Sequence, residues 1–180
     1  MFKLSMKLIN TTSEYGIIAK LFHWSTFLIL IVQIPLGFYF VSMDFSDKRI
    51  VFEDFHIMLG LIIFYITLFR LIFKIFNQSP KMSEVAFFGQ RLIASINHIL
   101  LYASLLSVTV SGILKKIYNG EKIEIFLINI KIKTDFDKAD LFYDMHIISN
   151  YLLITLLVLH ILAVIFHKIV LKDNILKKMI

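Results

Sequence analysis

The strongest constraint on this chain is an apolar stretch, Asp144 to Lys168, that is long enough to cross a bilayer and contains three histidines. A helix of about 20 apolar residues spans the roughly 30 Å hydrocarbon core of a membrane. His146, His160 and His167 follow one another at steps of 14 and 7 residues. A 14-residue step turns a helix by roughly 320° and advances it by about 21 Å, so these imidazoles share one stripe at different depths. Ionisable residues inside a bilayer are rare and usually functional, so the stripe predicts a functional site.

The composition indicates an integral membrane protein. Hydrophobic residues make up 58% of the 180 residues and lie in long blocks, whereas soluble domains contain about 45–50%. The chain has no cysteine, which excludes disulfides, iron–sulfur clusters, thiolate metal sites and c-type haem attachment. The formal net charge of +6 comes from basic residues that flank the apolar blocks, which is typical of topology signals and not of a nucleic-acid surface.

Four apolar blocks predict an all-α membrane protein in which a single domain, residues 1–180, forms one four-helix transmembrane bundle. The expected spans cover about 21–41, 55–76, 92–114 and 141–170. Residues 1–20 are polar and lack the apolar core of a signal peptide. In the connection from Lys115 to Asp140, the alternating segment KIEIFLINIKIKT predicts a strand or a small hairpin over one membrane face.

The flanking charges predict that both termini are cytoplasmic. Lys and Arg favour the cytoplasmic side of a membrane. They are more numerous at the N-terminus, between the second and third spans and in the C-terminal tail than in the other two loops. The acids sharpen the difference, since only three of the 13, Glu14, Glu84 and Asp173, lie on that side.

This orientation sorts four histidines into two depth-matched pairs. The first span enters from the cytoplasm and the second from outside, so His23 lies near the inner face and His56 near the outer face. The fourth span descends from outside, so His146 lies at the outer level and His160 at the inner level. Two imidazoles that face each other across a bundle are the axial ligands of a six-coordinate b-type haem. The sequence therefore predicts two such haems about 20 Å apart, with the ligand pairs His23/His160 and His56/His146.

Three further residues lie at the depths of these pairs. Gly37 follows His23 by 14 residues and Gly60 lies one turn below His56; both either make room for a flat macrocycle or simply let helices pack closely. Arg70 follows His56 by 14 residues and therefore lies at the inner level. It is suited to a haem propionate or a quinone oxygen, or else it is a positive-inside residue.

Two histidines remain outside the pairs. His98, about two turns into the third span, is expected to be a hydrogen-bonded pocket residue and not a ligand. His167, two turns below His160, is placed to hydrogen-bond a quinone head group or a propionate at the cytoplasmic edge. An alternative for the whole set is a non-haem metal site or the proton relay of a transporter, which a visible spectrum distinguishes from haem.

Six segments support a family resemblance. KLFHWS, PLGFY, FHIMLG, NHILLY, MHIIS and LHILAVIFHK occur in this order between about Tyr15 and Lys168. In this order the chain resembles the bacterial di-haem cytochrome b561 proteins, four-helix electron carriers of the inner membrane. The resemblance implies that electrons from superoxide at the outer surface reach ubiquinone at a site near His167. It also implies the haem ligands His23, His56, His146 and His160.

The outer loops depart from what a superoxide-oxidising protein favours. A positive funnel would attract the superoxide anion, but these loops contain more acids than bases. Four lysines could still form a local basic patch: Lys115, Lys116, Lys131 and Lys133. The alternative function is that of a cytochrome b membrane subunit of a dehydrogenase or hydrogenase, with a redox protein docked on the outer face.

Overall fold

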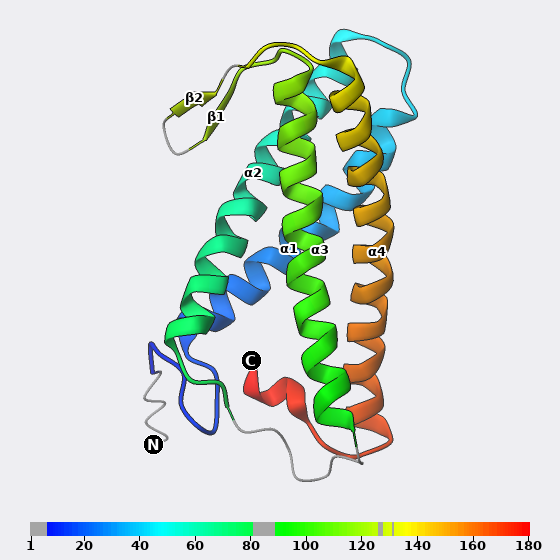
Figure 1. The fold of residues 1–180 in the computed structure, drawn as a ribbon. Coiled ribbons are helices and arrows are strands. Elements are labelled where there is room, and N and C mark those ends of the chain that lie inside the picture. The colour runs from blue at the N-terminus through cyan, green and yellow to red at the C-terminus, as the bar shows by residue number, and fades with distance from the viewer. Residues whose placement is uncertain (1–6, 81–88, 126–127, 131) are drawn as a thin grey trace.

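Four long helices form an antiparallel bundle in the computed structural model, which describes residues 7–80, 89–125, 128–130 and 132–180 (Figure 1). They are α1 (Ile17–Val41), α2 (Asp47–Phe76), α3 (Gln90–Tyr118) and α4 (Phe136–Ile169). All four are long and apolar enough to cross a membrane. The prediction of an all-α membrane bundle with four spans is therefore confirmed.

Helices α2 and α4 begin earlier than the apolar spans predicted from the sequence. Helix α2 starts at Asp47, because the Ser46 side chain accepts a hydrogen bond from the backbone N–H of Arg49. In the same way, the Asp135 carboxylate accepts a hydrogen bond from the backbone of Lys138 at the start of α4. Such caps satisfy the free N–H groups of a first turn. Hydropathy marks only the apolar part of each helix and misses these polar first turns.

A two-stranded hairpin connects α3 with α4. Strand β1 (Ile123–Ile125) pairs antiparallel with β2 (Ile128–Ile130), so that Ile123 faces Ile130 in the register. The predicted hairpin is thus confirmed within the described residues; residues 126, 127 and 131 of the predicted segment lie outside them. The end of the bundle that carries this hairpin is called the hairpin end below, and the opposite end the terminal end (Figure 1).

The buried core lies halfway along the bundle. It is a central apolar layer made of Leu30, Ile63, Leu105, Val108 and Leu153, to which all four helices contribute. Leu30 lies seven residues after His23, and Leu153 lies seven residues from both His146 and His160. Helices α3 and α4 pack closely here, with the hydroxyls of Ser107 and Ser149 2.7 Å apart. The core therefore separates two levels of histidines.

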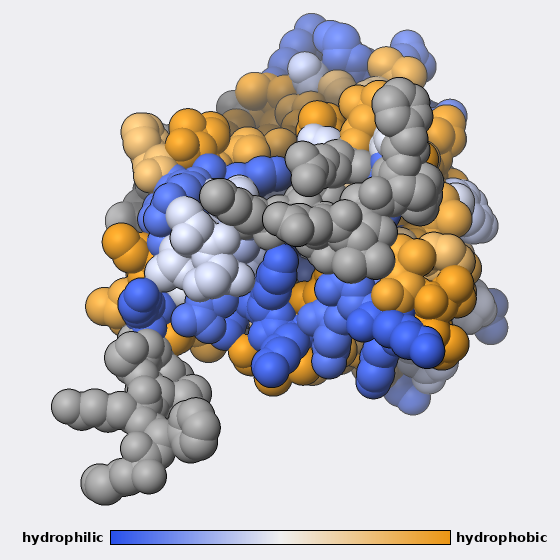
Figure 2. Space-filling model, turned by 90° about the horizontal axis from the view of Figure 1, so that it is seen from below, coloured by the Kyte–Doolittle hydropathy of each residue, from blue (hydrophilic) through white to orange (hydrophobic). Residues whose placement is uncertain are grey.

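The C-terminal segment folds back beneath the terminal end. Lys172 adopts a left-handed backbone conformation, with φ of 53°, where the chain leaves α4. The short 3₁₀ helix η1 (Ile175–Lys178) then passes under the bundle toward α1 (Figure 1). There Trp24 donates from its indole nitrogen to the Met179 carbonyl at 2.8 Å. Figure 2 looks onto this end and shows hydrophilic residues gathered on it, with hydrophobic residues around the sides.

Candidate haem sites

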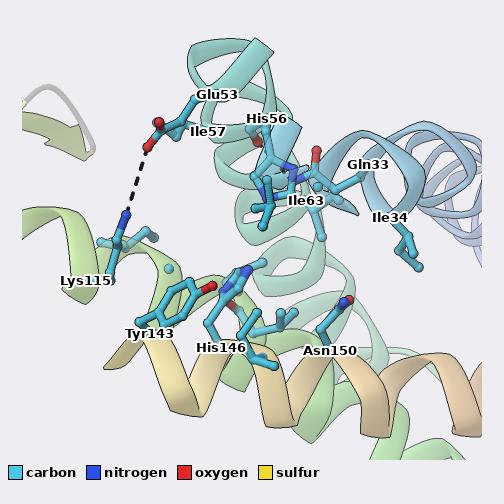
Figure 3. Close-up of a pocket in the computed structure, with 18 of the residues that line it drawn as sticks. Gln33, Ile34, Glu53, His56, Ile57, Ile63, Lys115, Tyr143, His146 and Asn150 are labelled. Carbon is cyan, nitrogen blue, oxygen red and sulfur yellow. Dashed lines mark hydrogen bonds and ion pairs between the residues drawn. The ribbon is translucent and has the colours of Figure 1, made fainter. Parts of the chain in front are cut away.

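At the hairpin end, α2 and α4 place His56 and His146 face to face. Their ring centres are 6.3 Å apart and the ring planes are inclined by 72°. A cavity of about 670 Å³ lies at this level and is lined by all four helices. Figure 3 shows both rings directed into it from opposite helices. The structure thus brings together the pair that the sequence predicts for one of the two levels.

Helices α1 and α3 supply glycines at this level instead of ligands. A Cβ atom on Gly37 would lie 3.0 Å from Cε1 of His56, and one on Gly112 would lie 3.1 Å from Nδ1 of His146. Both distances are tighter than ordinary contacts, so a Cβ at either position would push the neighbouring ring aside by a few tenths of an ångström. Gly60 lines the cavity, but a Cβ there would meet only Gln33, at an ordinary 3.4 Å.

The two rings of this pair differ in their hydrogen bonds. Nδ1 of His146 lies 2.7 Å from the Val108 carbonyl oxygen, and a carbonyl accepts only from a protonated nitrogen. Nε2 of His146 is therefore free to bind a metal, as in most metal-ligating histidines. Nδ1 of His56 is buried and has no hydrogen-bond partner among the described residues. Burying a nitrogen without a partner is costly. The described residues therefore leave one nitrogen of this pair, Nδ1 of His56, without a hydrogen bond.

At the terminal end, α1 and α4 bring His23 and His160 together. Their ring centres are 6.4 Å apart, inclined by 58°. Arg70 of α2 donates from Nη2 to Nδ1 of His23 at 3.1 Å, so this residue lies at the level expected from its spacing. His98 of α3, which the sequence leaves outside the pairs, lies with its ring centre 5.6 Å from that of His160. This level therefore gathers three imidazoles and a guanidinium.

Aromatic and cationic side chains surround this second pair. The guanidinium of Arg70 lies 5.3 Å and the ammonium of Lys74 lies 4.7 Å from the ring centre of Tyr102, both within cation–π range. Burial raises the pKa of the Tyr15 phenol, Tyr102 raises it further, and Arg70 opposes them. Tyr15 therefore stays protonated and can donate a hydrogen bond here. No sequence pattern indicates Tyr15 or Tyr102, which reach this level through the packing of the helices.

His167 lies beyond this pair, at the end of α4. Its side chain is 15% exposed, and Nδ1 is 3.4 Å from a carboxylate oxygen of Asp173. The Gln90 amide of α3 contacts Nε2 on the other side of the ring. The structure therefore places His167 at the edge of the bundle, as predicted, between two partners that no sequence pattern singles out. The available signal was weak: Asp173 is the lone acid of a basic tail.

Gly112 was also not singled out from the sequence, although its spacing offers a signal. It follows His98 by 14 residues, the same step that separates His23 from Gly37 and His146 from His160. One such step connects the two histidine levels along a helix. Applied to α3, it places Gly112 opposite the cavity at the hairpin end.

Both histidine pairs fit a six-coordinate haem. Two imidazoles that bind one metal at about 2 Å, each with about 1.1 Å from nitrogen to ring centre, have centres roughly 6 Å apart. The observed 6.3 and 6.4 Å agree with this. Within the described ranges, no group of three or more His, Cys, Asp or Glu residues is arranged to hold a bare metal ion. The donor sets therefore suit haem better than the non-haem metal alternative.

A membrane-embedded helical bundle with paired histidines at two depths defines a transmembrane haem protein of the electron-transfer class. The family model described as "Prokaryotic cytochrome b561" matches residues 14–180, so the chain belongs to the prokaryotic cytochrome b561 family. It is accordingly a multi-pass bacterial membrane protein that binds haem b and transfers electrons across the membrane. The chain is also 25% identical over 187 residues to "Cytochrome b561 homolog 2" of Escherichia coli (strain K12), covering 97% of this chain and 95% of that relative.

Proposed function

We propose that the protein oxidises superoxide at the outer face and reduces ubiquinone near the cytoplasmic face, through two b-type haems per chain. The observation that carries the proposal is the pair of histidine sets with nearly equal ring separations, 6.3 and 6.4 Å, at two levels of one bundle. In this proposal residues 1–180 form a single domain in the inner membrane. The hairpin end faces outward and both termini are cytoplasmic, in keeping with the distribution of flanking charges.

Four histidines would hold the two haems, His56 with His146 at the outer level and His23 with His160 at the inner level. When bound, each haem supplies a one-electron iron centre. The 14-residue step from His146 to His160 along α4 corresponds to about 21 Å. The central apolar layer lies between the levels and excludes water from the space across which electrons pass.

At the outer end, the reaction requires only that an anion approach. Superoxide gives up one electron and leaves as dioxygen, with no proton transfer. Arg49, Lys115 and Lys116 line the mouth of the outer cavity and can attract an anion. Lys133 is exposed, and Lys131, the remaining lysine of the predicted basic patch, lies outside the described residues.

At the inner end, the reaction requires protons. Ubiquinone takes up two electrons and two protons to become the quinol, so two molecules of superoxide are consumed for each quinone reduced. His167 is the proposed catalytic residue and donates a hydrogen bond or a proton to a quinone oxygen. Its contact with Asp173, at 3.4 Å, supports this role because the carboxylate can hold the ring in one orientation at the edge of the bundle.

Arg70 is proposed to steady a haem propionate or the charge that develops on the quinone. An arginine has donors only, so Nδ1 of His23 acts as the acceptor in their 3.1 Å contact. A histidine that binds iron through Nε2 carries a proton on Nδ1, and that proton would oppose the guanidinium. Arg70 must then turn to another acceptor, and a carboxylate at the same level suits its planar donors.

The quinone site is tested by His167→Leu. We expect both haem spectra to stay near normal, while oxidation of the reduced haems by added ubiquinone slows on the order of 10-fold or more, the scale of losing one general acid. Stopped-flow spectroscopy at the α bands measures this rate. Lys168→Gln, an exposed neighbour on the same helix, is the control and should keep the normal rate. Full quinone activity of the leucine variant would refute the assigned site.

One observation favours a second candidate for the electron donor. The outer loops contain more acids than bases, which suits a docked basic redox protein better than a small anion. The chain would then be the cytochrome b membrane subunit of a dehydrogenase or hydrogenase that passes electrons to quinone. Superoxide that fails to reduce the haems on rapid mixing would favour this candidate, whereas reduction within the mixing experiment supports the first.

A further inference from the structure

The open end of the outer cavity carries a connected group of charges. Glu53 of α2 lies at its centre, with Oε1 3.9 Å from Nζ of Lys115 and 3.6 Å from Nζ of Lys116 (Figure 3 draws the first contact). Lys116 also pairs with Glu121 after α3 and is only 12% exposed. Burial alone would raise the pKa of Glu121, but hydrogen bonds from Lys116 and Asn119 outweigh it and hold the pKa below its usual range. Lys116 therefore lies between two carboxylates, those of Glu53 and Glu121.

This group lies one helical turn outward from the proposed haem ligands. Glu53 precedes His56 by three residues on α2, so both share one face. Lys115 and Lys116 follow Gly112, which touches the His146 ring, by three and four residues on α3. One turn corresponds to about 5 Å. The charges thus stand between the ligand pair and the water at the outer end.

The chemistry of haem b decides what these charges can do. Its macrocycle is apolar and its two propionates are anionic, so in a cavity lined mostly by apolar residues the carboxylates must lie at the end that supplies cations. At this end the cations lining the cavity are Arg49, Lys115 and Lys116. Arg49 already donates to the Met43 carbonyl at 2.6 Å. That contact occupies only one nitrogen of the guanidinium, so Arg49 and both lysines can serve carboxylates. The two lysines also pair with Glu53.

We propose that Glu53 pairs with Lys115 and Lys116 beside the outer haem and thereby lowers the reduction potential of that haem. The inference rests on the proposed occupancy of the outer cavity. A carboxylate near the iron stabilises the more positive, oxidised state, whereas an ammonium stabilises the reduced state. Because Glu53 both adds a negative charge and partly neutralises two positive ones, it keeps the potential of the outer haem low. A low potential at the entry point favours onward transfer to the inner haem.

The test is a spectroelectrochemical titration of the haem-loaded protein with Glu53→Gln. The outer haem is identified as the component that disappears in His56→Ala. We expect its ratio of reduced to oxidised form at a fixed potential to rise about tenfold in Glu53→Gln, which equals about 59 mV for one electron. Lys116→Gln should lower the reduction potential of the same component. Glu53→Asp keeps the carboxylate and should leave that potential close to its normal value. The control Asp140→Asn removes an exposed acid on the same side, outside the cavity lining, and should leave it unchanged.

The possible failures are distinguishable. If His56→Ala retains both haem components, the proposed outer site is wrong, whatever Glu53 does. If His56→Ala loses one component but Glu53→Gln shifts it no more than Asp140→Asn does, the role of Glu53 is refuted while the haem site stands. If Glu53→Gln does not retain the outer haem, Lys116→Gln decides: an unchanged potential overturns the inference, and a lowered one supports it.

Discussion

At the scale of single residues, two glycines leave the space that the outer histidine pair occupies. Gly37 and Gly112 each lie against one of the two histidine rings, from helices that contribute no ligand at that level. The backbone of both glycines is helical, so neither is needed for an unusual conformation. What matters is the missing methyl group, which lets the rings stand at a separation of 6.3 Å. Elsewhere in a helix interior, glycine is destabilising relative to alanine by roughly 1 kcal/mol.

Gly37→Ala is therefore expected to disturb the outer haem although the substitution favours the helix. Its Cβ would lie 3.0 Å from Cε1 of His56, so the ring must move. We expect the outer component of the haem spectrum to be lost or broadened, as measured by absorbance and paramagnetic resonance. Ala103→Gly is the control, because this exposed position of α3 lies outside the cavity lining; it should keep both haems and cost up to about 1 kcal/mol. A normal spectrum for Gly37→Ala would show that the ring position is not critical.

At the scale of elements, the four helices repeat one spacing. Each carries a residue of the outer level and a residue of the inner level 14 positions apart, which are Gly37 and His23 on α1, His56 and Arg70 on α2, Gly112 and His98 on α3, and His146 and His160 on α4. The C-terminal segment belongs to no helix of the bundle and closes the terminal end. It is held there through side chains of α1, since Lys20 Nζ contacts the Ile180 oxygen at 2.7 Å and Trp24 contacts the Met179 carbonyl.

Trp24→Phe should loosen this C-terminal segment without unfolding the bundle. The variant loses the 2.8 Å hydrogen bond to Met179, worth about 1 kcal/mol, but keeps an aromatic ring beside His23 and Phe27. We expect amide hydrogen exchange in residues 174–180 to accelerate about 5-fold, the factor that corresponds to that energy. Ser42→Ala removes a side-chain hydrogen bond at the other end of α1 and should leave exchange in this segment unchanged. Equal exchange in both variants would mean that Trp24 does not hold the segment.

At the scale of the whole molecule, the hydrophilic surface lies at the two ends of the bundle and the histidine pairs lie at two levels, with the central apolar layer between these levels. The large hydrophobic side chains outside the core are mostly exposed, as expected for a surface that faces lipid and not water. Each level of histidines draws on all four helices. The central apolar layer thus separates the two haem sites, although all four helices contribute to both.

Purified protein is accordingly expected to contain about two haems per chain, extractable with acidified acetone because no cysteine can attach them. A pyridine haemochrome assay against protein concentration measures the ratio. His56→Ala should lower it toward one and leave a bis-histidine spectrum from the inner pair, since the two levels use different ligands. A stoichiometry of one or none in the unaltered protein would contradict the two-haem proposal.

The sequence predicted the features that depend on depth along a helix. Hydropathy located the four spans, and the alternating direction of these spans placed His23 with His160 and His56 with His146, which the structure brings face to face. Alternation of apolar residues also located the hairpin. These patterns follow from helix and strand periodicity, which are properties of the local chain.

Contacts between side chains of different helices could not be predicted from the sequence patterns. The contact of Gly112 with His146, the pairing of Glu53 with two lysines of α3 and the contact of Gln90 with His167 all depend on how the helices are rotated about their axes. Hydropathy fixes that rotation weakly in a membrane bundle, where the lipid side and the packed side are both apolar. The path of the C-terminal segment likewise depends on a single left-handed residue, Lys172.

The central apolar layer also gives the protein an electrical role. In the proposed orientation, an electron that passes from the outer to the inner level carries negative charge inward over about 20 Å of the roughly 30 Å hydrocarbon core. A full crossing against a membrane voltage that is negative inside costs about 2.3 kcal/mol per 100 mV, so this partial crossing costs about two thirds of that amount. Each turnover therefore adds to the membrane voltage. The voltage in turn opposes the transfer, so the inner haem must attract electrons more strongly than the outer one to keep them moving.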